Sequence, residues 1–257
     1  MEGLKIEDAI KINPNLKKYV FYENNKYKID FKNKDALIEY NKAILKHLFN
    51  LDVDFSREHL IPAVLSRYLF VKSSFETLNK LNIKNPKVLE VGTGSGVIAL
   101  LIKKLYSSSE VVTTEIDETL YNLAKNNFIK NNLNIEIIKS NGEILNLDEL
   151  KNRKFNLIIC YPPFYSDNSV PSKKRFGGAL AKTHELIGGG KFGELFCYKL
   201  IDESYNYLDK GLISIMLPKK PEKRRELIIN KMKEYYTVEV DNFTVGKRVR
   251  YVIKGIK

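Results

Sequence analysis

The sequence predicts an α/β protein, with a Rossmann-like parallel sheet preceded by a small N-terminal α/β extension. Three observations favour this fold class. Short apolar segments typical of buried strands alternate with helical segments from residue 87 onward. A glycine-rich turn, Gly92 to Gly96, directly follows the first of these strands. An acidic residue, Glu115, lies near the end of the second strand, 23 positions after Gly92.

The N-terminal extension is predicted to contain a β-hairpin and two helices. Apolar and aromatic residues over 19–22 and 26–30 flank an Asn24-Asn25 turn, and Asn tolerates the left-handed backbone that tight hairpins need. Residues 35–48 have helical periodicity, and an apolar Leu-Ile-Pro segment leads into a second helix that carries Arg67.

The Rossmann-like domain is predicted over residues 85–257, after an extension of residues 1–84. Its strands are predicted, in order, over 87–91, 110–116, 134–139, 155–161 and 211–217. Helices are predicted near 96–106, 118–131 and 191–207. Such alternation specifies a parallel sheet covered on both faces. The tail adds two strands, 236–240 and 250–256, joined by a basic connection.

The glycine-rich turn and the later acid predict a site for a nucleoside-containing cofactor. Glycines between a strand and a helix let such a ligand approach the backbone closely. The turn lacks the Gly-Lys-Ser/Thr of a phosphate-cradling loop, which disfavours nucleoside triphosphates. Glu115 can accept hydrogen bonds from both ribose hydroxyls. A dinucleotide and S-adenosylmethionine both fit these features.

A second motif, Tyr161-Pro162-Pro163-Phe164, follows the apolar run that begins at Phe155. Proline cannot donate to a sheet ladder, so the strand must stop there. Each proline also holds the preceding residue extended, which gives a stiff loop that presents carbonyl oxygens and a flat ring. Such a loop suits gripping a planar amine. Glycines, acid and Pro-Pro-Phe in this order favour S-adenosylmethionine, because a dinucleotide site would not explain residues 161–164.

Length and composition bound the remaining possibilities. The 257 residues contain no apolar run of the ~18 residues that a bilayer span needs. Cys160 and Cys197 have no metal-ligand spacing, and three scattered histidines suggest no metal centre. Because Cys160 lies in a strand expected to be buried, we expect no disulfide and a reducing cytoplasm. The sequence therefore predicts a cytoplasmic protein without metal or membrane partner, and a monomer.

Positive charge is concentrated outside the half that carries the cofactor motifs. The net charge is +12, yet residues 86–166 carry 9 basic and 9 acidic side chains. Residues 167–191 carry 5 basic and 2 acidic side chains, and residues 218–257 carry 12 basic and 5 acidic side chains. This distribution predicts a polyanionic partner, with nucleic acid as the first candidate. The long segment 166–190 follows Pro-Pro-Phe directly, so we expect it to border the reaction site.

Blocks at both ends of the chain connect these motifs to a known family. The blocks are Lys28-Ile29-Asp30-Phe31-Lys32, Leu60-Ile61-Pro62 with Arg67, Val91 to Gly96, Thr114-Glu115-Ile116-Asp117, Pro162-Pro163-Phe164, Thr183-His184-Glu185-Leu186 with Gly188-Gly189-Gly190, Met216-Leu217 with Lys219-Lys220, and Gly246 to Tyr251. With them the chain resembles the RNA adenine-N6 methyltransferases, from about Leu16 to Lys254. That family includes the bacterial large-subunit ribosomal RNA enzyme and the eukaryotic spliceosomal small nuclear RNA enzyme.

The resemblance implies a class I S-adenosylmethionine-dependent methyltransferase fold and assigns roles to particular residues. The implied cofactor-binding residues are Arg67, Gly92, Thr93, Gly94, Gly96, Glu115 and Tyr161. Arg67 is expected at the methionine carboxylate end. The implied catalytic clamp for the target base is Tyr161, Pro162, Pro163 and Phe164. The N-terminal extension and the long loop are expected to bind RNA.

Tyr161 departs from the family, which has Asn at this position. The leading interpretation is an enzyme that methylates adenine N6 in a structured RNA, either ribosomal or small nuclear-like. The same scaffold could methylate another nitrogen, such as guanine N2. A non-catalytic RNA-binding protein and a protein-amide methyltransferase are further alternatives, and the basic periphery argues against the last of these.

Overall fold

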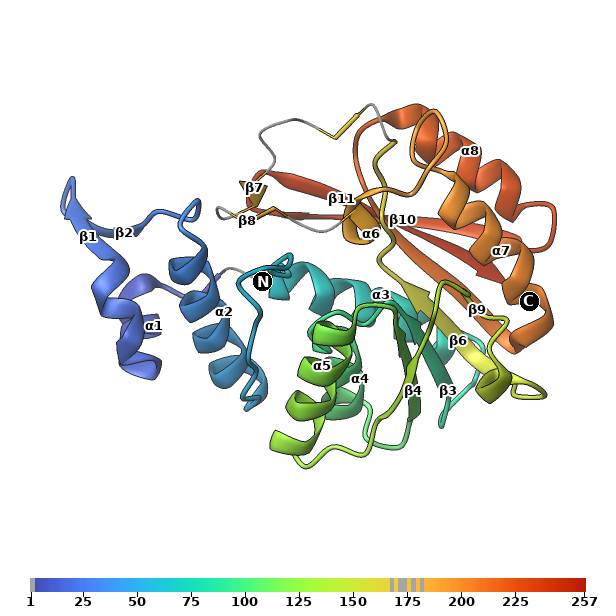
Figure 1. The fold of residues 1–257 in the computed structure, drawn as a ribbon, viewed down its shortest axis with the longest axis horizontal. Helices are drawn as coiled ribbons and strands as arrows, with labels where there is room; N and C mark the ends of the chain where they lie inside the picture. Colours follow the sequence, from blue (N-terminus) through green and yellow to red (C-terminus); the bar gives the residue numbers. More distant parts are fainter. Residues whose placement is uncertain (1–2, 167–168, 171–174, 177–178, 181–182) are drawn as a thin grey trace.

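A computed structural model describes residues 3–166, 169–170, 175–176, 179–180 and 183–257. Its centre is a seven-stranded sheet in the order β10-β11-β9-β6-β3-β4-β5. Figure 1 shows helices on both sides of this sheet and a small N-terminal lobe that projects from one end of the molecule. The predicted α/β class with an N-terminal extension is confirmed.

Five strands of the sheet are paired in parallel, and two more are added at one edge by antiparallel pairing. The parallel strands are β3 (Lys87–Val91), β4 (Glu110–Glu115), β5 (Glu136–Lys139), β6 (Phe155–Cys160) and β9 (Leu208–Pro218). The added strands are β11 (Arg248–Ile256), antiparallel to β9, and β10 (Thr237–Val245) at the edge, antiparallel to β11. The chain leaves β3 toward β4 on one side and later returns to β6 on the other. The carboxyl ends of β3 and β6 therefore flank the crevice where Rossmann-like sheets bind ligands.

Helices cover both faces of the sheet because its strands alternate apolar residues between them. One face packs against α3 (Val64–Lys80), α4 (Val97–Leu105) and α5 (Glu118–Lys130). The other packs against α7 (Leu195–Tyr207) and α8 (Glu222–Met232). Within β6, Leu157 and Ile159 belong to the first core, while Ile158 and Cys160 belong to the second. This alternation is the two-residue period of a strand buried on both sides.

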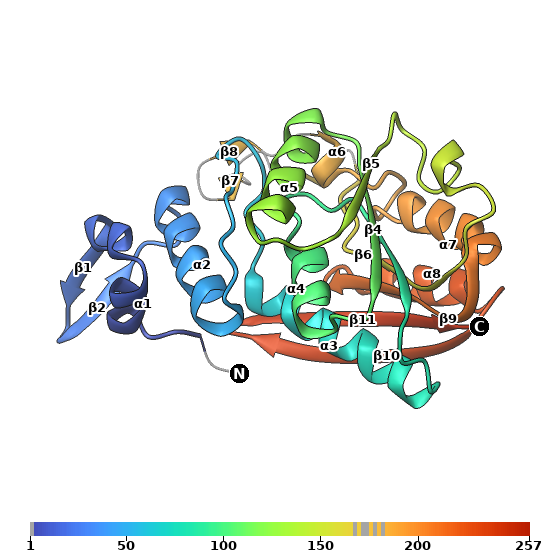
Figure 2. The same cartoon turned by 90° about the horizontal axis from the view of Figure 1, so that it is seen from below.

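The N-terminal lobe has a small core of its own. Its elements are α1 (Ile6–Ile12), a 3₁₀ helix (Pro14–Tyr19), β1 (Val20–Glu23), β2 (Lys26–Ile29) and α2 (Lys34–Phe49). The hairpin turns at Asn24 and Asn25, whose φ angles of 50° and 57° are left-handed as expected. In both views the hairpin lies at the end of the molecule far from α7 and α8 (Figure 2).

The segment between α2 and α3 crosses α5 and is held there by asparagine side chains. The Asp54 amide donates to Asn127 Oδ1 at 2.9 Å, and Asn127 Nδ2 donates back to the Asp54 carbonyl at 3.0 Å. Asn127 Nδ2 also donates to the Ser95 carbonyl in the glycine-rich turn, at 3.0 Å. Asn131 makes a similar pair of bonds with the backbone of Asp52. The segment is thus connected to the cofactor turn through one buried amide.

The structure corrects several sequence-based boundaries. Helix α7 begins at Leu195 and not near 191, because Gly189, Gly190 and Gly193 adopt left-handed φ angles. The basic connection expected between the tail strands is mostly strand, with only a tight turn at Gly246 and Lys247 between β10 and β11. Helices α1 and α8 were not predicted. The latter is dominated by charged residues, so its apolar stripe is only a few residues wide.

The long segment after Pro-Pro-Phe contains short elements. They are β7 (Arg175–Phe176), β8 (Ala179–Leu180) and α6 (Thr183–Leu186). Elsewhere in the chain, a short 3₁₀ turn (Asp148–Leu150) precedes β6. Lys173 and Lys174, which we expect to contact phosphates, lie outside the described residues. Among the described residues, no helix is both long and apolar enough for a membrane span.

Candidate functional site

A cavity of about 620 Å³ lies at the carboxyl ends of β3, β4 and β6. Its lining includes nearly all the site residues predicted from the sequence: Arg67, Gly92, Thr93, Gly94, Glu115, Tyr161, Pro162, Pro163 and Phe164. Gly96 is the exception. It lies at the start of α4, where a Cβ would come within 2.6 Å of the Phe128 ring, so its lack of a side chain serves helix packing.

The glycine-rich turn forms an open cradle at the floor of the cavity. Gly92 and Gly94 have left-handed φ angles of 72° and 60°, and a Cβ built on either would meet no atom within 4 Å. The amides of Gly92 and Thr93 both donate to the Thr114 carbonyl at 3.0 Å, which fixes the turn against β4. Both glycines therefore leave space for a ligand beside exposed backbone, and any other residue would strain the turn.

Glu115 ends β4 beside this cradle and is 4% exposed. Its Oε1 accepts hydrogen bonds from the amides of Ile116 and Asp117, each at 2.9 Å. Its Oε2 accepts from the Gly94 amide at 2.7 Å. Burial raises the pKa of Glu115, and these three backbone donors oppose that rise. The carboxylate is therefore held rigidly at the cavity wall, as a ribose-binding acid requires.

A second buried acid, Glu90, was not predicted as a site residue, although it stands in the Val-Leu-Glu-Val strand directly before the glycines. It is 2% exposed and lines the cavity. Its Oε2 accepts from Thr93 Oγ1 at 2.8 Å and from the Ala99 amide at 3.0 Å. Burial raises the pKa of Glu90 from 4.5 to about 8. Near neutral pH this carboxyl group is therefore mostly protonated.

Glu90 gives a pH prediction. The free energy of unfolding should fall as pH rises from about 4.5 to 8, because the folded protein keeps a proton that the unfolded chain releases. A cationic ligand group in the cavity favours the carboxylate, so binding should release a proton and affinity should rise toward pH 8. The limit is about tenfold per pH unit. Calorimetry with S-adenosylmethionine, in buffers of different ionisation enthalpy, measures the proton release and the change in affinity. Glu90→Gln should abolish the proton release; the same release in that variant would contradict the assignment.

Arg67 and Tyr161 both line the cavity and lie against each other. The guanidinium carbon of Arg67 is 4.3 Å from the centre of the Tyr161 ring, which is cation–π geometry. Burial lowers the pKa of Arg67 to about 10, and Tyr161 acts in the opposite direction. Arg67 therefore keeps its charge near neutral pH. Tyr161 provides a flat surface for this cation.

The Pro-Pro-Phe turn is held in place by two chain segments. The amides of Phe164 and Tyr165 both donate to the Leu186 carbonyl, at 3.0 and 2.8 Å. The glycine-rich run that follows packs directly against the turn, since a Cβ on Gly188 would lie 2.6 Å from the Pro163 carbonyl oxygen. The described end of the long segment, residues 184–189, thus returns to the clamp and lines the cavity, as expected for this part of the segment.

Arg224 of α8 supports the same turn, and the sequence did not predict this role. Its side chain is 2% exposed, and its guanidinium carbon lies 5.1 Å from the centre of the Phe164 ring. It donates to the Phe164 carbonyl, to the Lys220 carbonyl at 2.7 Å and to the Phe192 carbonyl at 3.3 Å. A basic residue in a strongly basic tail gave no signal that distinguished it from a surface cation.

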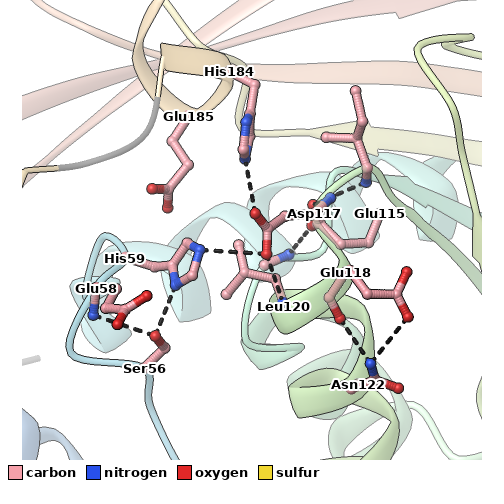
Figure 3. Close-up of polar contacts among 12 residues, drawn as sticks. Ser56, Glu58, His59, Glu115, Asp117, Glu118, Leu120, Asn122, His184 and Glu185 are labelled. Atoms are coloured by element: carbon pink, nitrogen blue, oxygen red, sulfur yellow. Dashed lines mark hydrogen bonds and ion pairs between the residues drawn. The ribbon is translucent and has the colours of Figure 1, made fainter.

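Two histidines left without a role in the sequence meet beside the cofactor cradle. His59 Nε2 is 3.3 Å from Asp117 Oδ1, and His184 Nε2 is 3.7 Å from Asp117 Oδ2 (Figure 3). Both cysteines are free and buried, and burial raises their pKa values. No group of three potential ligands for a metal ion occurs among the residues that the structure describes.

Comparison with known proteins identifies the family. The profile of an RNA methyltransferase family matches residues 5–199. The chain belongs to this family. A Methanocaldococcus jannaschii protein with a provisional methyltransferase name is 60% identical over the full length of both chains. The U6 small nuclear RNA (adenine-(43)-N(6))-methyltransferase of Schizosaccharomyces pombe is 28% identical, over 88% of this chain and 61% of the relative. The ribosomal RNA large subunit methyltransferase F of Christiangramia forsetii is 26% identical, over 76% of this chain and 73% of the relative.

Solved structures agree with the fold. The catalytic domain of human METTL16 in complex with an RNA hairpin covers 97% of this chain and 91% of its own, with a TM-score of 0.84 and 23% identity. The N-terminal domain of human METTL16 with S-adenosylhomocysteine covers 98% of this chain and 94% of its own, with a TM-score of 0.77. The RNA methyltransferase has the class I sheet, and its cofactor is S-adenosylmethionine. The open glycine cradle and the fixed Glu115 carboxylate fit that cofactor.

Proposed function

We propose that this RNA methyltransferase transfers a methyl group to the N6 amine of an adenine in a structured RNA. The observation that carries the proposal is the position of the Pro-Pro-Phe turn. It lies at the end of β6, in the same cavity as the glycine cradle of β3 and the Glu115 carboxylate of β4. Relatives named as adenine-N6 methyltransferases of small nuclear RNA support the choice of base.

The cavity residues suit the chemistry of an adenine amine. When bound, S-adenosylmethionine supplies an electrophilic methyl group on a sulfonium. The amine is a weak nucleophile because its lone pair is delocalised into the ring, so acceptors for its hydrogens favour attack. The Pro162 carbonyl is one candidate acceptor, and the Tyr161 hydroxyl is another. The Phe164 ring can hold an extruded base by stacking, worth about 1–3 kcal/mol.

For the cofactor, we propose that Gly92, Thr93 and Gly94 receive it along the backbone. Glu115 then binds the ribose hydroxyls. Arg67, stacked on Tyr161, contacts the methionine carboxylate, which balances the Arg67 charge in a poorly solvated position.

The N-terminal extension, residues 1–84, is the proposed RNA-binding part, and residues 85–257 the methyltransferase domain. Phe21, Tyr22 and Tyr27 of the hairpin are 47%, 63% and 45% exposed. The Tyr22 and Tyr27 rings are 5.1 Å apart at the tip, and Lys26 and Lys28 lie on β2 beside them. Exposed rings among cations suit unpaired nucleotides, whose bases stack and whose phosphates are negative.

The decisive experiment for the proposed function is mass spectrometry of nucleosides. RNA from cells that lack the gene should lose one N6-methyladenosine, and purified protein should restore it with radiolabelled S-adenosylmethionine. Loss of N2-methylguanosine instead would move the target to another nitrogen. Cofactor binding without transfer to any cellular RNA would indicate a non-catalytic RNA-binding protein.

Tyr161→Asn tests the departure from the family at the clamp. We expect the variant to preserve or raise N6-methyladenosine formation, because the prolines and Phe164 still receive the base and Asn offers an amide oxygen. Tyr161→Phe is the matched control: it keeps the surface under Arg67 and removes only the hydroxyl. We expect it to lower the rate of transfer without changing cofactor affinity. A drop in native activity for Tyr161→Asn would show that Tyr161 adapts the cavity to another nucleophile.

Phosphate binding by the basic segments predicts a strong salt dependence. Log affinity for RNA should fall linearly with log salt concentration. Reversing Lys173, Lys174 and Arg175 to Glu should flatten that slope by about one unit for each phosphate that the protein no longer neutralises. Reversal of three exposed lysines in the neutral half, Lys104, Lys125 and Lys151, serves as the control. Equal slopes for the two triple variants, measured by fluorescence anisotropy, would exclude the loop as a phosphate-binding segment.

A further inference from the structure

Three segments far apart in the sequence meet at the Asp117 carboxylate (Figure 3). His59 comes from the segment between α2 and α3, Asp117 follows β4, and His184 lies in α6 after the long loop. His59 is 1% exposed, and its Nδ1 is 2.7 Å from the Ser56 hydroxyl. That contact orients the ring so that Nε2 is directed at Asp117. The side chain of His184, 34% exposed, approaches the other carboxylate oxygen.

A second set of contacts holds α6 on the N-terminal extension. Glu185 Oε1 accepts a hydrogen bond from the Leu60 amide at 3.0 Å. The charge of Glu185 also acts on the buried Lys34 of α2: burial lowers the pKa of Lys34, and Glu185 opposes this shift. The α6 segment is therefore attached to the cofactor edge through His184 and to the extension through Glu185.

Asp117 is connected directly to the cofactor cradle. Its backbone amide donates to Glu115 Oε1 at 2.9 Å, and Glu115 Oε2 accepts from the Gly94 amide. Leu60, His184 and Glu185 all line the cavity. His184 also acts on Glu115, because it opposes the rise in the Glu115 pKa that burial causes. A change in the position of the Glu115 carboxylate therefore reaches Asp117, and through it the two histidines.

Helix capping alone does not account for this arrangement. Asp117 caps α5 by accepting from the Leu120 amide through Oδ1, at 3.0 Å. A cap needs one oxygen, and Asn performs it about as well as Asp. His59 approaches the capping oxygen Oδ1, whereas the second oxygen, Oδ2, faces His184, and the negative charge serves both histidines. Asp117→Asn therefore separates the two functions, because it keeps the cap and removes the charge.

We propose that His59, Asp117 and His184 form a latch that couples cofactor binding to the docking of α6 and the glycine run 188–190 over the cavity. Asp117 is its positioning residue. When the cofactor binds to the Glu115 carboxylate, the contacts of Asp117 with the two histidines become tighter. The segment that supports the Pro-Pro-Phe turn therefore becomes ordered when the cofactor binds. This inference depends on the cofactor site and is independent of which RNA base is methylated.

Hydrogen exchange followed by mass spectrometry tests the latch without RNA. In the wild-type protein, S-adenosylhomocysteine should slow amide exchange both at Gly92–Gly94 and over residues 183–190. In Asp117→Asn the protection at Gly92–Gly94 should remain, while that over 183–190 should largely disappear. Affinity for S-adenosylhomocysteine should fall about tenfold, the size of a typical coupling between two sites. His184→Asn, at a partly exposed position, should reproduce the local effect, and His47→Asn, an exposed histidine of α2, is the control.

Two results would overturn the latch. One is ligand-induced protection over 183–190 that is equal in wild type and both variants. The other is a uniform rise in exchange in Asp117→Asn, which would mean that the carboxylate serves stability alone. The double variant Asp117→Asn/His184→Asn should show no further loss of coupling beyond Asp117→Asn, because both changes break one interaction. If wild type failed to bind S-adenosylhomocysteine at all, the cofactor site itself would be refuted, which is distinguishable from failure of the latch.

Discussion

Glu115→Ala should weaken the binding of S-adenosylmethionine about 100-fold or more. A carboxylate that accepts from two ribose hydroxyls makes two charge-assisted hydrogen bonds, each worth about 1.5–3 kcal/mol. The same change removes the acceptor of three backbone amides, including that of Gly94. The cradle should therefore loosen as well, and isothermal titration calorimetry with S-adenosylmethionine measures the sum of both effects.

Glu118→Ala is the matched control for this experiment. Glu118 is an exposed acid on the first turn of α5, near Glu115 in sequence, and it lies outside the cavity lining. Its removal should leave the affinity within a factor of about two. If a folded Glu115→Ala protein bound the ligand as tightly as wild type, the ribose would have to be held elsewhere in the cavity.

Arg224→Met should lower the free energy of unfolding by about 3 kcal/mol and greatly reduce methyl transfer, while cofactor affinity changes little. The substitution leaves the carbonyls of Phe164, Phe192 and Lys220 without their buried donor, and each unsatisfied group costs about 1–3 kcal/mol. The Pro-Pro-Phe turn loses its support, whereas the glycine cradle on β3 and β4 keeps all its contacts. Chemical denaturation, calorimetry and single-turnover transfer give the three quantities.

Lys223→Met provides the comparison, because Lys223 is the preceding residue of α8 and pairs with Glu226 at the surface. It should leave all three quantities unchanged. Arg224→Lys should recover part of the stability but not the transfer rate, since an ammonium cannot satisfy three carbonyls in the plane of a guanidinium. Parallel losses of cofactor affinity and transfer in Arg224→Met would contradict a role confined to the clamp.

The parallel sheet and most of the cavity lining could be predicted because they follow from local patterns. Runs such as Val88 to Val91 and Phe155 to Cys160 are short and largely apolar, so their burial on both faces follows directly. The glycines, Glu115 and Pro-Pro-Phe each lie at the end of such a run. Parallel strands bring their carboxyl ends to one edge, which places these motifs together without further information.

The residues that sequence reasoning missed depend on contacts between distant segments. Glu90 resembles any polar residue in a strand until its burial is known. Arg224 lies among lysines and arginines in a helix whose charged residues hid its narrow apolar face. His59 and His184 are 125 positions apart, so no spacing rule connects either of them to Asp117. Only the folded chain shows that these side chains meet.

The amide of Asn127, which joins the Asp54 backbone to the Ser95 carbonyl, has a consequence for how the protein denatures. Because that side chain is 1% exposed, detaching the N-terminal segment leaves a buried donor unsatisfied next to the glycine turn. We therefore expect this bond to couple unfolding of the small lobe to that of the large sheet. Heat or denaturant should unfold both parts together, in one cooperative transition.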